Sequence, residues 1–193
     1  MRAYHSLPDG YREVLQINMQ SDRKTALKIN VGAGIVNVLV LVAGHFIVPY
    51  TEFLNMSPVS AVFLRFAVMI IAYIAYMAMH ELTHAAVMKA VGGGKVVFGF
   101  TGLYAFAGSR EDWFDKTAYR CIALAPLIVW GIVFGFLAFV VPRSWFWVVW
   151  FLQAGNIGGA AGDVYVTAKL WHMPDTILVR DTGVDMTVYG RQE

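Results

Sequence analysis

The sequence holds little cysteine and no strongly basic segment, and each scarcity excludes a class of protein. Its single cysteine, Cys121, has no partner in the chain, which excludes an intramolecular disulfide and a cysteine metal cluster. The net charge is only +2, and the lysines and arginines are spread over several loops, so nucleic-acid binding has no support. Residues 1–30 lack a short apolar core followed by a small-residue cleavage site, so we predict no removable signal peptide.

Charged residues are also scarce. They make up 15% of the 193 residues, whereas hydrophobic residues make up 58%, which is too apolar for an ordinary soluble domain. A helix needs about 20 predominantly apolar residues to cross the hydrocarbon of a membrane, and four runs approach or meet that length: about 29–48, 58–91, 121–141 and 145–168. We therefore expect one polytopic, all-α domain in the lipid bilayer, with about four transmembrane helices.

The lysines and arginines predict the orientation of these spans. Most of them lie in the tails 1–28 and 169–193 and in the loop between the second and third spans. The loop 51–57 has none, and Arg143 is the only one between the last two spans. Because short cytoplasmic loops are enriched in lysine and arginine, both termini are expected to face the cytoplasm.

The local sequence between and after the spans suggests less regular structure. Ser57 and Pro58 predict the start of the second helix, and Gly92 and the two glycines after it predict its end. Residues 95–108 are rich in glycine and β-forming residues and predict a short β-hairpin or re-entrant segment at the membrane surface. The tail after His172 is expected to be irregular or extended over short stretches.

The end of the second span carries the motif H-E-x-x-H. On a helix, His80 and His84 project from one face because they are four residues apart, so they can bind one metal ion together. Glu81 lies close enough to contact a water molecule at that ion, as the general base of a metalloprotease must. The alternative is a pair of histidines that end a helix at the membrane interface. Ionisable residues inside a span are costly and usually functional, which favours the metal site.

A catalytic zinc ion normally has three protein ligands and an open position. At 1.5 Å per residue, His80 lies about 33 Å along the second helix from Pro58, near the cytoplasmic edge of the hydrocarbon. Asp163 lies about 27 Å along the fourth helix from Trp145, at nearly the same level, and is the predicted third ligand. His172 is its rival, because a bend in the chain could return it to the site. Asp163 could instead be an interfacial carboxylate beside glycines that only pack helices.

Asn156 lies two helical turns before Asp163. Its amide could orient a peptide substrate or bind the developing oxyanion by hydrogen bonding. A single asparagine in a membrane helix also often bonds to a neighbouring helix, and the sequence favours neither role.

The HELTH segment and the later GNIGGAAGD segment resemble the site-2 protease group of intramembrane zinc metalloproteases. They are more similar still to a zincin-peptidase family of small bacterial membrane proteins. The site-2 group binds Zn²⁺ through the two motif histidines and a distant aspartate, which implies His80, His84 and Asp163 as ligands and Glu81 as the base. The sequence lacks the proline and the Asp-Gly pair common near that aspartate, since Val164 follows Asp163. The resemblance implies a protein of the bacterial plasma membrane.

The expected function is hydrolysis of peptide bonds in membrane-associated or transmembrane-helix substrates by metal-activated water. The substrate must present an extended backbone, and the predicted hairpin at 95–108 could supply an edge for such a strand. Two alternatives remain: a non-catalytic metal-binding membrane protein, such as a sensor or transporter, and a regulatory subunit.

Overall fold

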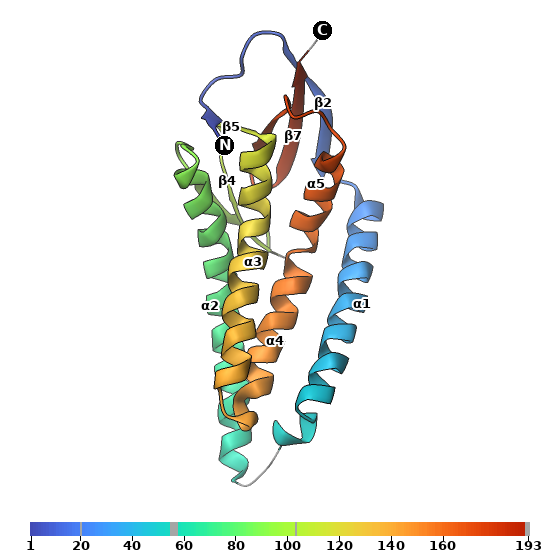
Figure 1. The fold of residues 1–193 in the computed structure, drawn as a ribbon, viewed down its shortest axis with the longest axis vertical. Coiled ribbons are helices and arrows are strands. Elements are labelled where there is room, and N and C mark those ends of the chain that lie inside the picture. Colours follow the sequence, from blue (N-terminus) through green and yellow to red (C-terminus); the bar gives the residue numbers. More distant parts are fainter. Residues whose placement is uncertain (20, 55–57, 103, 192–193) are drawn as a thin grey trace. The chain divides into compact units, whose positions relative to one another are not determined.

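A computed structural model describes residues 1–19, 21–54, 58–102 and 104–191 of the chain. It is a mixed α/β protein that is 61% helical, with a five-stranded antiparallel sheet and a two-stranded sheet (Figure 1). The all-α fold class predicted from the sequence is therefore wrong. The prediction failed because the strands lie in the polar tails and loops, which hydrophobic runs do not reveal.

The five-stranded sheet joins the two ends of the chain. Its strand order is β1-β5-β6-β7-β2, and every neighbouring pair is antiparallel. The N-terminal tail supplies two strands, the segment before Lys116 supplies one, and the C-terminal tail supplies two. They are β1 (Ala3–Tyr4), β2 (Tyr11–Asn18), β5 (Trp113–Asp115), β6 (Leu178–Asp181) and β7 (Asp185–Arg191). The tail after His172, expected to be irregular or extended over short stretches, forms two strands of this sheet.

The two-stranded sheet is a hairpin of β3 (Val97–Phe100) and β4 (Ala105–Gly108). Its position falls within the segment 95–108 where the sequence predicts a hairpin. Among the described residues, β4 pairs with β3 alone, so the other edge of β4 joins no strand. This edge lies beside the candidate site, as shown below.

Within the described residues, three helices are long and apolar enough to cross a membrane: α1 (Arg23–Ile47), α2 (Val59–Ala90) and α3 (Lys116–Val140). The fourth predicted run is not one helix. It forms α4 (Arg143–Gly159) and α5 (Ala161–Trp171), separated at Ala160, and a short 3₁₀ helix, η1 (Tyr50–Glu52), follows α1. Ser57, the predicted N-cap of α2, lies outside the described residues.

Glycine ends α2, as the sequence predicts. Gly92 has a φ of +90°, a left-handed conformation that costs glycine little because it has no Cβ. The N–H of Gly93 then donates to the carbonyl of Met88 at 2.8 Å, which completes a Schellman motif. The helix therefore stops six residues after His84, and the chain turns away toward the hairpin.

The chain divides into two compact units. Unit 1 consists of Met1–Ile29, His80–Ala125 and Gly162–Glu193, and unit 2 consists of Asn30–Met79 and Pro126–Ala161. All seven described strands belong to unit 1, together with α5, the last turns of α2 and the first turns of α3. The single polytopic domain expected from the sequence stays a prediction.

The core of unit 1 lies between the five-stranded sheet and these helical segments. Phe114, Leu170, Val179 and Val188 have almost no exposed surface, and Ile122 is buried with them. Burying such side chains is the main favourable term in folding, about 1.5–3 kcal/mol for each large aliphatic or aromatic residue. The packing fixes α5 and the first turns of α3 on the sheet, and both of these segments contribute to the candidate site.

Unit 2 is held by close contacts of α4 with α1 and α2. The indole N–H groups of Trp147 and Trp150 donate to carbonyl oxygens of α1 and its C-terminal end, at 3.0 and 2.8 Å. A Cβ on Gly155 would collide with the ring of Tyr73, and one on Gly158 with the side chain of Asn37. The glycines of α4 therefore permit the close helix packing that small residues allow in membranes.

Candidate metal centre

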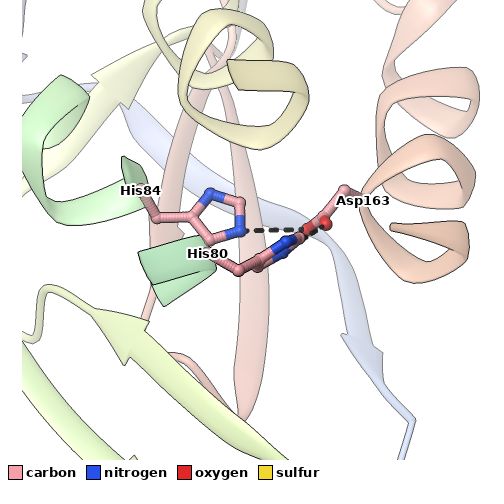
Figure 2. Close-up of side chains that lie close together, drawn as sticks. All are labelled: His80, His84 and Asp163. Carbon is pink, nitrogen blue, oxygen red and sulfur yellow. Dashed lines mark ion pairs between the residues drawn. The ribbon is translucent and has the colours of Figure 1, made fainter. Parts of the chain in front are cut away.

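Three side chains of unit 1 point toward one another (Figure 2). His80 and His84 lie on one face of α2, and Asp163 lies in the first turn of α5. Nε2 of His80 is 3.5 Å from Oδ2 of Asp163, and Nε2 of His84 is 3.7 Å from Oδ1 of the same residue. The structure thus brings together the two motif histidines and the aspartate that the sequence selects as a third partner.

The geometry fits a tetrahedral metal ion. One ligand atom from each of the three residues lies within 4.8 Å of the other two. In a tetrahedral zinc site with bonds of about 2.1 Å, neighbouring ligand atoms are about 3.4 Å apart, close to the nitrogen–oxygen distances seen here. Two imidazole nitrogens and a carboxylate form a typical catalytic donor set, which leaves the fourth position for water or substrate.

The cluster is largely shielded from solvent. The side chains of His80 and His84 are 11% and 10% exposed, and that of Asp163 is 25% exposed. Burying a carboxylate is costly unless a positive charge or hydrogen bonds compensate it. A bound cation would supply that compensation.

A hydrogen bond orients His84. Its Nδ1 lies 2.8 Å from the carbonyl oxygen of Ile122 in α3, and the contact is buried. Because a carbonyl oxygen only accepts, Nδ1 carries the proton and Nε2 keeps its lone pair. Nε2 is the atom that faces Asp163. Metal-binding histidines commonly donate a hydrogen bond from their second ring N–H in this way, which fixes the tautomer and the orientation of the ring.

Glu81 lies between this cluster and the hairpin. Its carboxylate interacts with the backbone N–H of Ala107 in β4 and, through charge, with His80, His84 and Asp163. It occupies the position beside the first histidine that a general base for hydrolysis needs. The hairpin therefore contacts the residue on which the expected chemistry depends.

The hydrogen-bond pattern of the hairpin shows which backbone groups face outward. The N–H of Thr101 donates to the carbonyl of Tyr104 at 3.0 Å, so this pair at the turn is hydrogen-bonded. Bonded and non-bonded pairs alternate along an antiparallel ladder, so Ala105 and Ala107 belong to non-bonded pairs. Their backbone N–H and C=O groups point away from β3, which agrees with the contact between Ala107 and Glu81.

Sequence reasoning missed a buried pair that influences the site. The hydroxyl of Tyr119 in α3 donates to Oδ2 of Asp181 in β6 at 2.6 Å, and the N–H of Gly183 donates to Oδ1 at 2.7 Å. Burial raises the pKa of Asp181, although these two hydrogen bonds and the charge of His84 act to lower it. The local sequence around Asp181 carries no signal for this role, because it depends on the non-local pairing of β6.

The two remaining predicted residues are not part of the described metal-binding group. His172 follows the end of α5 and is exposed, and it is not in the described metal-binding group. Asn156 belongs to α4 of unit 2 and is fully buried. Its Oδ1 accepts a hydrogen bond from the hydroxyl of Tyr76 at 2.8 Å, and its Nδ2 donates to the carbonyl of Leu127 at 3.1 Å. Both partners belong to unit 2, so Asn156 holds helices together there.

The chain was compared with known protein families, curated proteins and solved structures. A family model with the description "Putative zincin peptidase" matches residues 73–178, which include every residue of the cluster and the hairpin. No curated protein and no solved structure matches the chain.

Proposed function

Because the chain belongs to the Putative zincin peptidase family, we propose that it is a membrane-embedded zinc metalloprotease that cleaves membrane-associated or transmembrane substrates. The observation that carries this proposal is the convergence of His80, His84 and Asp163 next to Glu81. The family description supports a zinc metallopeptidase in general. Three helices long and apolar enough to cross a membrane support the membrane location.

His80 and His84 would hold the metal through Nε2, and Asp163 would hold it through a carboxylate oxygen. Bound there, Zn²⁺ would lower the pKa of water toward about 7 and polarise the carbonyl of the scissile bond. The charge of Asp163 would partly neutralise the cation, and the hydrogen bond from His84 to Ile122 keeps the imidazole in the tautomer that can ligate.

Glu81 would act as the general base and then as the general acid. Its carboxylate takes a proton from the attacking water and passes it to the nitrogen of the leaving amine. The backbone N–H of Ala107 would orient the carboxylate for the first transfer. A positioned carboxylate of this kind contributes about 10²- to 10⁴-fold to the rate of proton-transfer catalysis.

The outer edge of β4 would bind the substrate. A helix hides its carbonyl groups in its own hydrogen bonds, so the cleaved segment has to be extended. Ala105 presents an outward N–H and C=O, and Ala107 presents an outward C=O, with which an extended peptide can pair as an added strand. Such a strand would run past Glu81, since Ala107 contacts that carboxylate.

The distribution of charge supports an orientation with both termini and the active site toward the cytoplasm. Lys24 and Lys28 begin α1, and Lys89 ends α2. Short cytoplasmic segments next to spans carry an excess of such residues. The substrates would then be cleaved near the cytoplasmic surface of the bilayer, which fits a plasma-membrane protein of bacteria.

Glu81→Gln tests the function directly. The glutamine keeps the size of the side chain but cannot accept the proton, so we expect bound zinc to be unchanged and cleavage to fall by about 10²- to 10⁴-fold. Purified protein in detergent or liposomes would be assayed with a library of labelled transmembrane peptides, and zinc would be measured by elemental analysis. Glu111→Gln, at an exposed residue, is the matched control.

Two results would reject the protease. Cleavage by Glu81→Gln at the wild-type rate would show that Glu81 is not the base. A wild-type protein that binds zinc but cleaves no peptide of the library would instead support a metal-binding sensor or transporter.

A further inference from the structure

A proline lies inside α3, in the middle of a helical segment. Pro126 is fully buried, and α3 continues on both sides of it. Proline has no backbone N–H, so the carbonyl group four residues earlier loses its normal helical donor. That carbonyl belongs to Ile122. The proline ring also crowds this carbonyl and turns it away from the helix axis.

The carbonyl that Pro126 leaves without an intrahelical donor is the one that contacts the metal centre. The oxygen of Ile122 accepts a hydrogen bond from Nδ1 of His84 at 2.8 Å. The buried carbonyl is thereby satisfied, as buried backbone groups must be. The N–H of His84 thus takes the place of the helical donor that Pro126 lacks.

We propose that Pro126 is a positioning residue of the metal centre. It acts through the Ile122 carbonyl, which it keeps available as the acceptor that holds His84 with Nδ1 protonated and Nε2 directed at the metal. This inference rests on the proposed function, since it assigns a role at the same site. Pro126 itself contacts neither the metal nor the substrate in this role.

The alternative bonding state explains why the proline matters. With an N–H at position 126, the Ile122 carbonyl would turn toward the helix axis and bond within α3. His84 would then lose its acceptor or share it, and the other tautomer, which places the lone pair on Nδ1, would gain population. Loss of such an outer partner lowers metal affinity by about 10- to 100-fold in known zinc sites.

Pro126→Ala is the first test, because alanine restores the N–H and favours a regular helix. We expect its dissociation constant for Zn²⁺ to rise by about 10- to 100-fold, measured in detergent by competition with a chromophoric chelator. Its thermal unfolding midpoint is expected not to fall. Pro142→Ala, at the proline that precedes α4, is the matched control and should bind zinc as the wild type does.

A backbone variant separates the N–H from the shape of the proline ring. Incorporation of the α-hydroxy analogue of alanine at position 126 gives an ester, which has the alanine side chain but no N–H. We expect this variant to bind zinc with wild-type affinity and to show the wild-type absorption spectrum with Co²⁺. It also keeps the inference testable if Pro126→Ala does not fold.

The outcomes distinguish the inference from the function on which it rests. A wild-type protein without stoichiometric zinc would overturn the proposed metalloprotease. Wild-type zinc binding together with unchanged affinity in Pro126→Ala would overturn only the role of Pro126. Equal loss of affinity in the alanine and ester variants would overturn it as well, because the N–H would then not be the cause.

Discussion

Nε2 of His80 lies 3.5 Å from Oδ2 of Asp163, although the two residues belong to helices far apart in the chain. His80 lies in the last turns of α2, and Asp163 lies in the first turn of α5. The break at Ala160 makes the start of α5 a helix N-terminus, where a negative side chain is favoured by the helix dipole. The carboxylate is therefore held near the histidines by a local feature of its own helix.

Asp163→Ala should remove zinc from the site. Loss of a direct ligand is expected to cost more than loss of an outer partner, so the dissociation constant should rise by more than about 100-fold. Elemental analysis after purification and chelator competition would measure it. His172→Ala is the matched comparison, because the structure places His172 on an exposed segment after α5. It should bind zinc as the wild type does. If instead His172→Ala lost zinc and Asp163→Ala kept it, His172 would be the third ligand.

Sequence reasoning could find the cluster but not its surroundings. The proximity of His80 and His84 follows from a spacing of four in a helix, and counting the rise along two helices places Asp163 at nearly their level. The fourth run was expected as one helix, whereas it is divided at Ala160. The sequence prediction also does not include the acceptor for His84, although Pro126 leaves the carbonyl of Ile122 without a helical donor.

The fold class failed for a physical reason. Hydrophobic runs dominate the composition and predict helices well, but strand pairing is non-local. In β2, Glu13 pairs with Tyr189 of β7, so the two tails form neighbouring strands. Each tail holds only short β-forming runs, and their pairing partners lie far away in the sequence, so a local pattern does not reveal the sheet. The hairpin of β3 and β4 could be predicted because its two strands are close together in the sequence.

A buried carboxylate ties three segments of unit 1 together. Asp112 is 1% exposed, and it accepts hydrogen bonds from the hydroxyl of Ser109 at 2.5 Å and the N–H of Gly94 at 2.8 Å. His5 Nδ1 lies 2.7 Å from its other oxygen. Burial acts to raise the pKa of Asp112, but these hydrogen bonds together outweigh it and hold the pKa below its ordinary value.

Unit 1 should become less stable in acid, because Asp112 loses its stabilising contribution when it is protonated. Because its pKa is lower in the folded state, its contribution is complete above the unfolded value of about 3.9 and disappears as the pH falls through the folded pKa. Asp112→Asn should lower the free energy of unfolding by about 1–3 kcal/mol at pH 7, since the amide has no charge and keeps only one acceptor oxygen for the groups bonded to Asp112. The difference from the wild type should shrink toward low pH in thermal unfolding between pH 3 and 7. A constant difference over this range, or an equal effect of Glu111→Gln, would contradict the assignment.

Asn156 should stabilise unit 2 rather than take part in metal binding. Its amide is bonded to Tyr76 and to the carbonyl of Leu127 in a fully buried position. Asn156→Ala leaves these partners without it and should cost about 1–3 kcal/mol of stability. The affinity for zinc should not change.

A double-mutant cycle checks the pair. Tyr76→Phe removes the hydroxyl alone, and its effect should not add to that of Asn156→Ala, with a coupling of about 0.5–3 kcal/mol. Unfolding in detergent would be followed by circular dichroism. Additive effects would contradict the coupling between Tyr76 and Asn156, and a loss of zinc in Asn156→Ala would favour a role of this amide at the metal centre.

Ala105→Pro should impair the binding of extended substrates without disrupting the hairpin. Position 105 belongs to a non-bonded pair with Phe100, so its N–H points to the outer edge of β4 and proline removes no bond to β3. The ring removes one donor for an added strand, and kcat/KM for a transmembrane peptide should fall while zinc content stays constant. One lost hydrogen bond of about 0.5–1.5 kcal/mol corresponds to roughly a two- to tenfold change.

Phe106→Pro is the structural comparison, because it removes a ladder bond with Gly99 and should destabilise the hairpin. If Ala105→Pro cleaves as the wild type does, the substrate does not pair with this edge, and the active site has to receive it in another way.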